Sequence, residues 1–301
     1  MKLVVRADDF GFSKILNEGL VKSIEDGITT TVDMMLDTPG LEDACSRLKN
    51  YPWISCGWHT HFWWKPTLSA AEVPSLINPE TGRFISNLKV NPDVNFEEAV
   101  KECRAEVLNC IRFLGRAPDT TDMNPKMMGP FEEARLKVCD EFGIAWGFQE
   151  KHFKAPHRPD HGDEVLEETD VTYPREQYKD LDIYNPTDIH SLAAVHQDSA
   201  EFFLKNYDPV QYYIDDPDNM KAHKVSVQPW HPGYVDEFVR IVYDNPLLNA
   251  CRPVDLYSLC SERVKQWIRE EKVELVNFRD AIHGTREYQN HLKAIGSDLA
   301  I

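Results

Sequence analysis

Seven short runs of apolar and β-branched residues recur along the chain and predict strands. They cover residues 3–5, 29–36, 53–61, 119–124, 144–148, 224–228 and 273–278. Strands that are buried on both faces of a parallel sheet read as such continuous apolar runs, because helices cover the two faces. The pattern therefore predicts a parallel sheet with covering helices.

Amphipathic helices are predicted between these runs, where apolar residues recur every three or four positions. They cover residues 14–26, 41–49, 95–114, 130–142 and about 254–270. Ser13 is a candidate N-cap, and Gly27, Gly115 and Gly143 mark helix ends. Alternating strands and helices predict an α/β fold of about seven strands, either closed into a barrel or left open and doubly wound.

Residues 151–220 interrupt this alternation, since Asp, Glu, Pro, Tyr and His residues replace the apolar pattern. The acidic run DHGDEVLEETD within them is typical of a solvated surface rather than a metal site. We therefore expect a single domain over residues 1–301, with a long irregular excursion at about 151–220.

The composition narrows the class of protein. Hydrophobic residues make up 42% and charged residues 28% of the chain, as in soluble globular proteins. A net charge of −17 disfavours nucleic acid, and the apolar runs are too short for a membrane span or a signal peptide. The seven cysteines show no CxxC spacing and are interpreted as reduced thiols. We expect a cytoplasmic protein that does not bind membranes, with a homo-oligomer possible.

Polar residues follow the predicted strands at the positions where those strands end. In a parallel α/β barrel these strand ends open on one face, which carries the active site. The residues concerned are Asp8 and Asp9, His59 and His61, Asp122 and Asn124, His231, and Arg279 and Asp280. We expect these four pairs and one single residue, five sites in all, to converge at one mouth.

Each motif has both a structural and a chemical interpretation. Asp8 and Asp9 could cap the following turn, or one could bind a cation while the other remains free as a base. His59 and His61 would share one face of a strand and could address one ion. His231 precedes a Pro-Gly turn, and a histidine there could donate a proton to a leaving group or simply hydrogen-bond in a loop.

Five segments together carry a family resemblance that covers most of the chain. ADDFG, GITTTVDMML, CGWHTHF, SLINPETGRFI and WHPGY occur in this order. They resemble the YdjC-like carbohydrate deacetylases, the group that includes chitooligosaccharide deacetylases. The resemblance implies a deformed (β/α) barrel, as in polysaccharide deacetylase-like folds. It also implies removal of acetyl groups from N-acetylated sugars or oligosaccharides with a divalent metal ion.

The resemblance also implies roles for individual residues. Asp8 would be the general base, Asp9 and His59 would be metal ligands, and His231 would be the general acid. One position departs from the family, because Asn124 stands where a third histidine ligand is expected. An amide oxygen favours Mg²⁺, with Zn²⁺ as the alternative.

Several other residues are expected near the ion or the substrate. His61 and Asp122 are candidate accessory residues for the metal or the substrate, and the partner of Arg6 could be Asp280 or a substrate anion. The candidate substrate contacts are Arg6, Trp63, Trp64, Arg83, Phe84 and Trp230. Two other functions remain open, namely a catalytically weakened relative that binds a carbohydrate or metabolite, and a metal-dependent hydrolase of a non-sugar amide.

Overall fold

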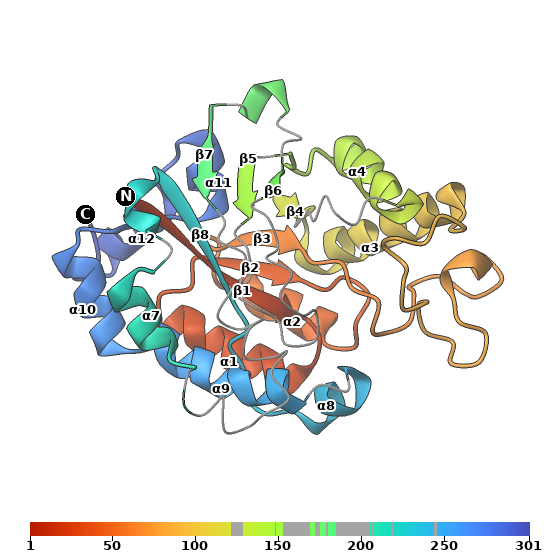
Figure 1. Ribbon diagram of the computed structural model, residues 1–301, viewed down its shortest axis with the longest axis horizontal. Helices are drawn as coiled ribbons and strands as arrows, with labels where there is room; N and C mark the ends of the chain where they lie inside the picture. Colours follow the sequence, from red (N-terminus) through yellow and green to blue (C-terminus); the bar gives the residue numbers. More distant parts are fainter. Residues whose placement is uncertain are drawn as a thin grey trace.

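A parallel sheet forms the centre of the protein, as Figure 1 shows for the computed structural model. Its strands lie in the order β4-β3-β2-β1-β8-β7-β5-β6, and β9 pairs separately with β1. The pairs are parallel except β5–β6, which is antiparallel. The strands are β1 (Lys2–Phe10), β2 (Thr31–Met34), β3 (Ser55–Trp58), β4 (Thr120–Thr121), β5 (Gln149–His152), β6 (Thr169–Val171), β7 (Asp182–Tyr184), β8 (Val225–Trp230) and β9 (Glu274–Leu275).

The structure describes ten ranges of the chain. They are residues 1–121, 129–147, 149–152, 169–171, 175–178, 180–184, 205, 207–217, 219–243 and 246–301. Much of the expected excursion at 151–220 lies outside them, and so do Asp122 and Asn124. No helix within these ranges has both the length and the apolar content needed to cross a lipid bilayer.

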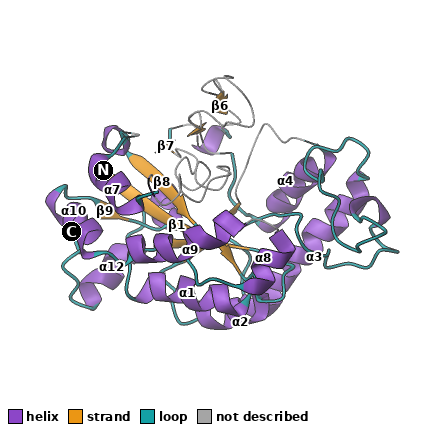
Figure 2. Cartoon of the chain, turned by 60° about the horizontal axis from the view of Figure 1, so that its bottom comes forward, coloured by secondary structure: helices purple, strands orange, loops and turns teal. Residues whose placement is uncertain are grey.

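Helices surround the sheet, as Figure 2 shows from a second direction. Helix α1 packs against α2 and α9, and α3 packs against α2 and α4. The α-helices are α1 (Lys14–Glu25), α2 (Leu41–Leu48), α3 (Phe96–Leu114), α4 (Pro130–Phe142), α7 (Pro209–Asp215), α8 (Glu237–Tyr243), α9 (Pro246–Leu259), α10 (Glu262–Glu270), α11 (Phe278–His283) and α12 (Glu287–Ala294). A curled parallel sheet with surrounding helices confirms the predicted deformed (β/α) barrel.

Local sequence signals account for the helix ends. The Ser13 hydroxyl accepts a hydrogen bond from the Leu16 backbone N–H, so Ser13 is the N-cap of α1. Gly115 ends α3 and Gly143 ends α4, both with positive φ angles. The predicted single helix at 254–270 is wrong in one respect. Helix α9 ends at Leu259, and Ser261 caps a separate helix, α10.

Two predicted strands are also shorter or displaced. Within residues 144–147, the prediction of a strand at 144–148 is wrong, because Ala145 forms only an isolated bridge to Thr120. The strand predicted at 273–278 is reduced to β9, whose two residues pair only with Lys2 and Leu3 at the start of β1. The end of β9 therefore lies beside the beginning of β1, not beside its end.

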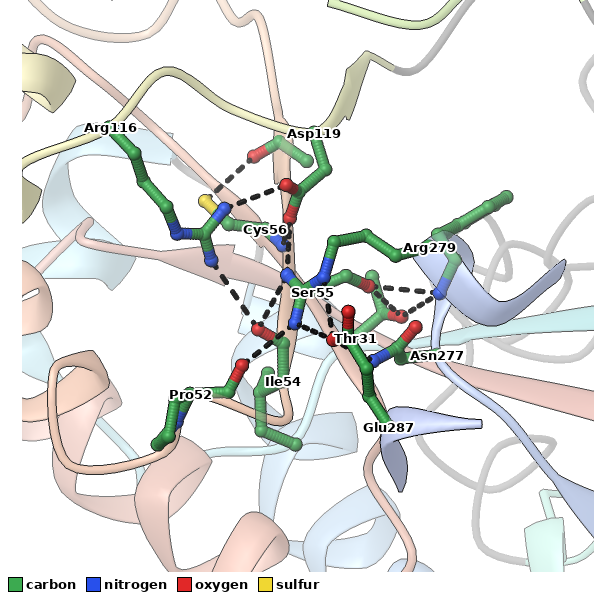
Figure 3. A network of polar contacts seen from close by, with 12 residues as sticks. Thr31, Pro52, Ile54, Ser55, Cys56, Arg116, Asp119, Asn277, Arg279 and Glu287 are labelled. Carbon is green, nitrogen blue, oxygen red and sulfur yellow. Dashed lines mark hydrogen bonds and ion pairs between the residues drawn. The ribbon is translucent and has the colours of Figure 1, made fainter. Parts of the chain in front are cut away.

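This placement puts Arg279 at the amino ends of the strands, as Figure 3 shows. Its guanidinium donates to Asp119 and Glu287 and to the backbone carbonyls of Pro52 and Ile54, which precede β3. The network closes the end of the barrel that is remote from Asp8 and Asp9. The expectation that Arg279 would share their mouth is therefore wrong.

Asp280 also serves the fold at this end. Its carboxylate accepts hydrogen bonds from the Thr285 hydroxyl and from the backbone N–H groups of Glu287 and Tyr288. These contacts join α11 to α12. The suggested pairing of Asp280 with Arg6 is therefore wrong, because Arg6 has carboxylate partners elsewhere.

Candidate functional site

Asp8 lies at the carboxyl end of β1 and is held by Arg6, two residues earlier on the same strand. The Arg6 Nε and Nη2 atoms donate to the two Asp8 oxygens at 2.7 and 2.9 Å. Such a bidentate pair fixes the plane of the carboxylate. Both residues are buried, so the orientation of Asp8 is set by the protein rather than by solvent.

Asp9 occupies an irregular part of the strand. Its φ is +68°, and the register between β1 and β2 shifts between Ala7 and Phe10. A left-handed aspartate breaks the alternation of side chains, so Asp9 faces a different set of partners from Asp8. The Arg252 Nη2 atom donates to Asp9 Oδ2 at 2.6 Å, and His59 Nε2 lies 3.4 Å from Asp9 Oδ1.

The charges around Asp9 decide its protonation. The Asp9 and Arg252 side chains are both fully buried. Burial opposes ionisation of Asp9, but Arg252 and the nearby His59 and His231 outweigh it and hold its pKa well below the ordinary value. Asp9 is therefore a carboxylate at neutral pH, with one oxygen paired to Arg252 and the other directed to His59.

Asp33 is a third buried carboxylate at this end of the sheet. Its Oδ2 lies 3.4 Å from Arg6 Nε and 4.0 Å from His59 Nδ1. A Cβ at Gly57, the opposite residue on β3, would lie 1.9 Å from Asp33 Oδ1. The glycine of the GWHTH segment therefore makes room for Asp33 beside His59.

His231 follows β8, and its backbone is hydrogen-bonded to a residue of helix α9. Its backbone N–H donates to Asp255 Oδ2 at 2.9 Å, and the Tyr207 hydroxyl donates to the other Asp255 oxygen. Burial lowers the pKa of His231, although Asp9 and Asp8 act in the opposite direction. The imidazole thus lies within the field of both aspartates, whose charges favour its protonated form against the effect of burial.

The turn after His231 depends on a close approach of two backbones. A Cβ at Gly19 of α1 would lie 2.6 Å from the Cα of Gly233, so any larger residue would push the two segments apart. Gly233 also donates its backbone N–H to the Arg252 carbonyl at 3.1 Å. Helices α1 and α9 therefore fix the turn that carries His231.

Asp255 gives a testable prediction for stability against pH. Burial raises the pKa of Asp255 from 3.8 to about 7. A raised carboxyl pKa favours folding below the unfolded value, and this contribution is lost as pH rises from about 4 to 7. The shift corresponds to roughly 4 kcal/mol at 1.36 kcal/mol per pKa unit. Asp255→Asn should therefore gain stability relative to the wild type at pH 8 but not at pH 4.

Urea denaturation at the two pH values measures this difference. An Asn amide can still accept from the His231 N–H through its oxygen and donate to the Tyr207 oxygen through its nitrogen. An exposed variant, Asp215→Asn, is the control and should show no pH-dependent gain. Equal stability of Asp255→Asn and wild type at pH 8 would contradict the raised pKa.

The residues around Asp9 meet the chemical requirements of a divalent ion. Asp9 Oδ1 is buried and has no well-formed hydrogen bond, which leaves an acceptor directed at His59. Two ligand atoms at about 2.1 Å from one ion lie about 3.0 Å apart at the octahedral angle and about 3.4 Å apart at the tetrahedral angle. The separation of Asp9 Oδ1 and His59 Nε2 is 3.4 Å, so a carboxylate and an imidazole fit a shared cation.

His61 is directed at a different carboxylate. Its Nε2 lies 2.6 Å from Asp37 Oδ1, and its Nδ1 accepts a hydrogen bond from the Trp63 backbone N–H at 3.1 Å. Strand β3 ends at Trp58, so the alternation that would place His59 and His61 on one face no longer applies. The structure therefore does not bring His61 together with Asp9.

The half-buried rings of Trp63 and Trp64 pack with the buried ring of Phe12 and the partly buried ring of Phe238. Trp63 stacks on Phe12 with ring centroids 6.1 Å apart, and Trp64 meets the edge of Phe238 at 5.2 Å. The Arg83 guanidinium lies over the Trp64 ring at 5.8 Å. Three candidate substrate contacts, Trp63, Trp64 and Arg83, thus lie together beside the loop that follows β3.

Two other candidate substrate contacts are core residues. Trp230 is 1% exposed and donates its indole N–H to the Tyr213 hydroxyl at 2.6 Å. Phe84 is 4% exposed and packs edge-on against Phe131. Both rings pack inside the protein, and their contact with substrate stays a prediction.

Three residues of the constellation were not predicted from the sequence. Asp33 sits in an apolar strand, and a charged residue there was a signal for a buried partner. Arg252 and Asp255 are three apart and so share a face of α9, but no local pattern connects them with Asp9. Asp122 and Asn124 lie outside the described residues, so their proposed roles remain predictions.

Comparison with known proteins adds to this geometry. The family model described as YdjC-like protein matches residues 2–270. The chain belongs to the YdjC-like family. This membership agrees with the five segments that carry the resemblance. It places Asp8, Asp9, His59 and His231 inside the matched region.

Relatives match almost the whole chain. A protein of Listeria innocua named carbohydrate deacetylase 2 is 25% identical over 290 residues, which cover 93% of this chain and 98% of the relative. A protein of Brevibacillus brevis named carbohydrate deacetylase is 26% identical over 93% of this chain and 99% of the relative. A shorter match of 27% identity reaches a chitooligosaccharide deacetylase of Serratia marcescens, over 40% of this chain and 47% of the relative.

A solved structure supports the fold. It is a protein of Enterococcus faecalis whose description names cellobiose-phosphate cleavage, with a TM-score of 0.63 and 19% identity. The alignment covers 93% of this chain and 98% of that chain. The (β/α) arrangement is thus shared over nearly the full length of both proteins.

Proposed function

We propose that the protein is a carbohydrate deacetylase that hydrolyses the acetamido group of N-acetylated sugars or oligosaccharides with the help of a divalent ion. The observation that carries the proposal is the 3.4 Å separation of Asp9 Oδ1 and His59 Nε2, beside Asp8 and His231. Membership of the YdjC-like family and the names of the relatives support the substrate class.

Asp9 and His59 would hold the ion. A bound divalent ion supplies positive charge that polarises the acetyl carbonyl and favours loss of a proton from water. Mg²⁺ is our first choice and Zn²⁺ the alternative, because the expected third ligand is Asn124 rather than a histidine. Asp33 lies on the other side of the His59 ring and would help to orient it.

Asp8 would act as the general base. Arg6 fixes its carboxylate, yet each oxygen keeps a second lone pair that can accept a proton from the attacking water. As the water oxygen adds to the acetyl carbon, Asp8 takes the water proton. Because Arg6 already holds the Asp8 side chain in one orientation, little conformational entropy is lost when the reactive geometry is reached.

His231 would act as the general acid. An amine leaves readily only when its nitrogen is protonated, so a proton donor on the leaving-group side is required. The imidazole gives its proton to the sugar nitrogen as the carbon–nitrogen bond breaks, which yields acetate and a free amino sugar. Asp255 holds the backbone of His231 in place for this transfer.

The half-buried rings of Trp63 and Trp64 provide apolar faces for the sugar. Pyranose rings pack their C–H faces against aromatic rings, and the neighbouring Arg83 offers hydrogen bonds to hydroxyl or anionic groups. This arrangement favours an oligosaccharide or a substituted sugar over a small free amide.

Acetate release from N-acetylglucosamine oligomers tests the proposal. Protein treated with a chelator should be inactive, and added Mg²⁺, Zn²⁺, Mn²⁺ or Co²⁺ should restore turnover. Asp9→Asn should prevent this restoration by weakening ion binding, whereas the exposed control Asp93→Asn should behave like the wild type.

Two results would argue for the other functions. If none of the four ions supports acetate release while the oligomers still bind, the protein is a carbohydrate-binding relative. If the protein ignores the oligomers but cleaves other amides in an ion-dependent way, it is a hydrolase of a non-sugar substrate.

A further inference from the structure

A cluster of three buried carboxylates lies between helix α3 and the loops that follow β2 and β3. Asp37, Glu102 and Glu106 each offer an oxygen atom, and these atoms lie within 4.8 Å of one another. Glu102 and Glu106 are 0% and 3% exposed, and the Asp37 side chain is 1% exposed. Carboxylates are rarely buried together without a cation, because their charges repel one another in a medium of low dielectric.

We propose that Asp37, Glu102 and Glu106 form a second cation site, separate from Asp9 and His59, that takes a hard divalent ion of the Ca²⁺ type. The donor set consists of oxygen atoms alone, which suits Ca²⁺ or Mg²⁺ rather than Zn²⁺. Three oxygen atoms within 4.8 Å of one another are compatible with a shared Ca²⁺ ion, whose oxygen ligands lie about 2.4 Å away in a flexible arrangement.

The hydrogen bonds around the cluster favour ionised carboxylates. The backbone N–H groups of Thr67 and Leu68 donate to the two oxygens of Glu102, at 2.5 and 3.0 Å. The Trp58 indole N–H donates to Glu106 Oε2 at 2.8 Å. Each of these contacts uses the carboxylate as an acceptor, so the hydrogen bonds by themselves favour the ionised form of both glutamates.

Asp37 supplies a second and independent indication of a ligand. Its Oδ1 lies 2.6 Å from His61 Nε2, which leaves Oδ2 for another partner. This Oδ2 is buried and has no hydrogen bond. Leaving a buried polar atom without a hydrogen bond costs about 1–3 kcal/mol of lost hydration, and more if the group is charged. An ion or a proton bound to this oxygen would compensate for that cost.

Without an ion, burial and mutual repulsion oppose ionisation of the cluster, and a bound cation would offset this cost. Burial and the neighbouring carboxylates raise the pKa of Glu106 well above its ordinary value. Burial raises the pKa of Glu102 to about 7, against the hydrogen bonds from Leu68 and Thr67. Within the described residues, Arg135 lies near Glu106, and it already pairs with Glu132. In the part of the chain that the structure describes, no lysine or arginine forms an ion pair with Asp37, Glu102 or Glu106.

A cation here would have a structural role. It would fasten three segments, namely the loop after β2, the 59–68 segment and helix α3. The 59–68 segment carries His59 and the aromatic residues Trp63 and Trp64. A cation bound to Asp37, Glu102 and Glu106 would thus stabilise the 59–68 segment beside the candidate site. It would share no ligand with an ion at Asp9 and His59.

Titration calorimetry with Ca²⁺ on chelator-treated protein tests the proposal. The wild type should bind one equivalent of Ca²⁺, and Glu106→Gln should weaken this binding by about 100-fold, since one charged ligand of three is lost. Glu97→Gln, at an exposed position on the same helix, should bind Ca²⁺ like the wild type. Asp9→Asn should also retain Ca²⁺, which separates this site from the one in the proposed function.

A second variant keeps the test decisive if Glu106→Gln does not fold. Asp37→Asn keeps an oxygen that can accept a hydrogen bond from His61 but removes the negative charge. It should lose Ca²⁺ affinity and still show a cooperative thermal unfolding transition. Absence of Ca²⁺ binding to the wild type at millimolar concentration would overturn the proposal, because the cluster would then hold protons alone. Unchanged affinity in both Glu106→Gln and Asp37→Asn would overturn it as well.

Discussion

Asp8→Asn is expected to lower kcat by about 10³-fold without releasing the divalent ion that Asp9 and His59 are proposed to hold. General bases contribute about 10²–10⁴ to turnover, and an amide cannot accept the water proton. The variant keeps an oxygen for one of the two Arg6 hydrogen bonds, so the local structure should persist. The loss should appear in kcat rather than in KM, because the proposed base would act on the reacting water rather than on the sugar.

Acetate release and metal content, measured on the same preparation, check this expectation. Glu141→Gln is a matched control, because Glu141 also forms a bidentate pair with an arginine, Arg104, but on the surface. The control should retain full activity. If Asp8→Asn loses its ion instead, the roles of Asp8 and Asp9 are exchanged.

Much of the fold follows from short-range patterns in the sequence. The apolar run at Leu3–Val5 extends into β1, and the helical spacing of Val100, Cys103 and Val107 marks the buried face of α3. These patterns predict elements because each element buries one continuous stripe or strand. The failures occur where tertiary pairing decides the length, as in β9, which finds a partner only at the start of β1.

The candidate site was predictable to the extent that residues follow strand ends. Asp8, Asp9, His59 and His231 do lie together, because neighbouring parallel strands present their carboxyl ends at one edge. Their individual roles remain predictions. Arg252 could not be predicted, because its partner Asp9 is 243 residues away and no periodicity records that contact.

Side-chain direction was the least predictable feature. His61 would share a face with His59 only if β3 continued past Trp58, and the chain instead turns toward Asp37. Trp230 follows the strand pattern of β8 but points to Tyr213 in the core. The position of an aromatic residue or histidine near a motif is therefore weak evidence that its side chain contacts the substrate. The residue at which the strand ends must also be known, because it decides the direction of the side chains that follow.

The second large effect is expected from Arg252→Met. Without an added ion, this variant should lose about 3–5 kcal/mol of the free energy of unfolding at pH 7, because it leaves the Asp9 carboxylate buried without its partner. The Arg252 and Asp9 side chains are both 0% exposed, so water cannot replace the lost interaction. Urea denaturation in the presence of a chelator measures the change.

A surface pair provides the matched control. Arg104→Met removes a bidentate pair with Glu141 that is partly exposed, and it should cost less than about 1 kcal/mol. Adding Asp9→Asn to Arg252→Met should recover part of the stability, since the unpaired charge is then gone. A loss below about 1 kcal/mol in Arg252→Met would show that Asp9 does not depend on Arg252.

The dependence on pH and on added ion makes this prediction specific to Asp9. Arg252 holds the pKa of Asp9 below its ordinary value of 3.8, which favours folding above pH 4 and is lost as pH falls. In Arg252→Met the Asp9 pKa rises, so the loss of stability relative to the wild type should shrink toward pH 4, where Asp9 takes a proton. A divalent ion that binds Asp9 should replace the missing positive charge. It should therefore stabilise Arg252→Met more than it stabilises the wild type, and an equal effect on both would place the ion elsewhere.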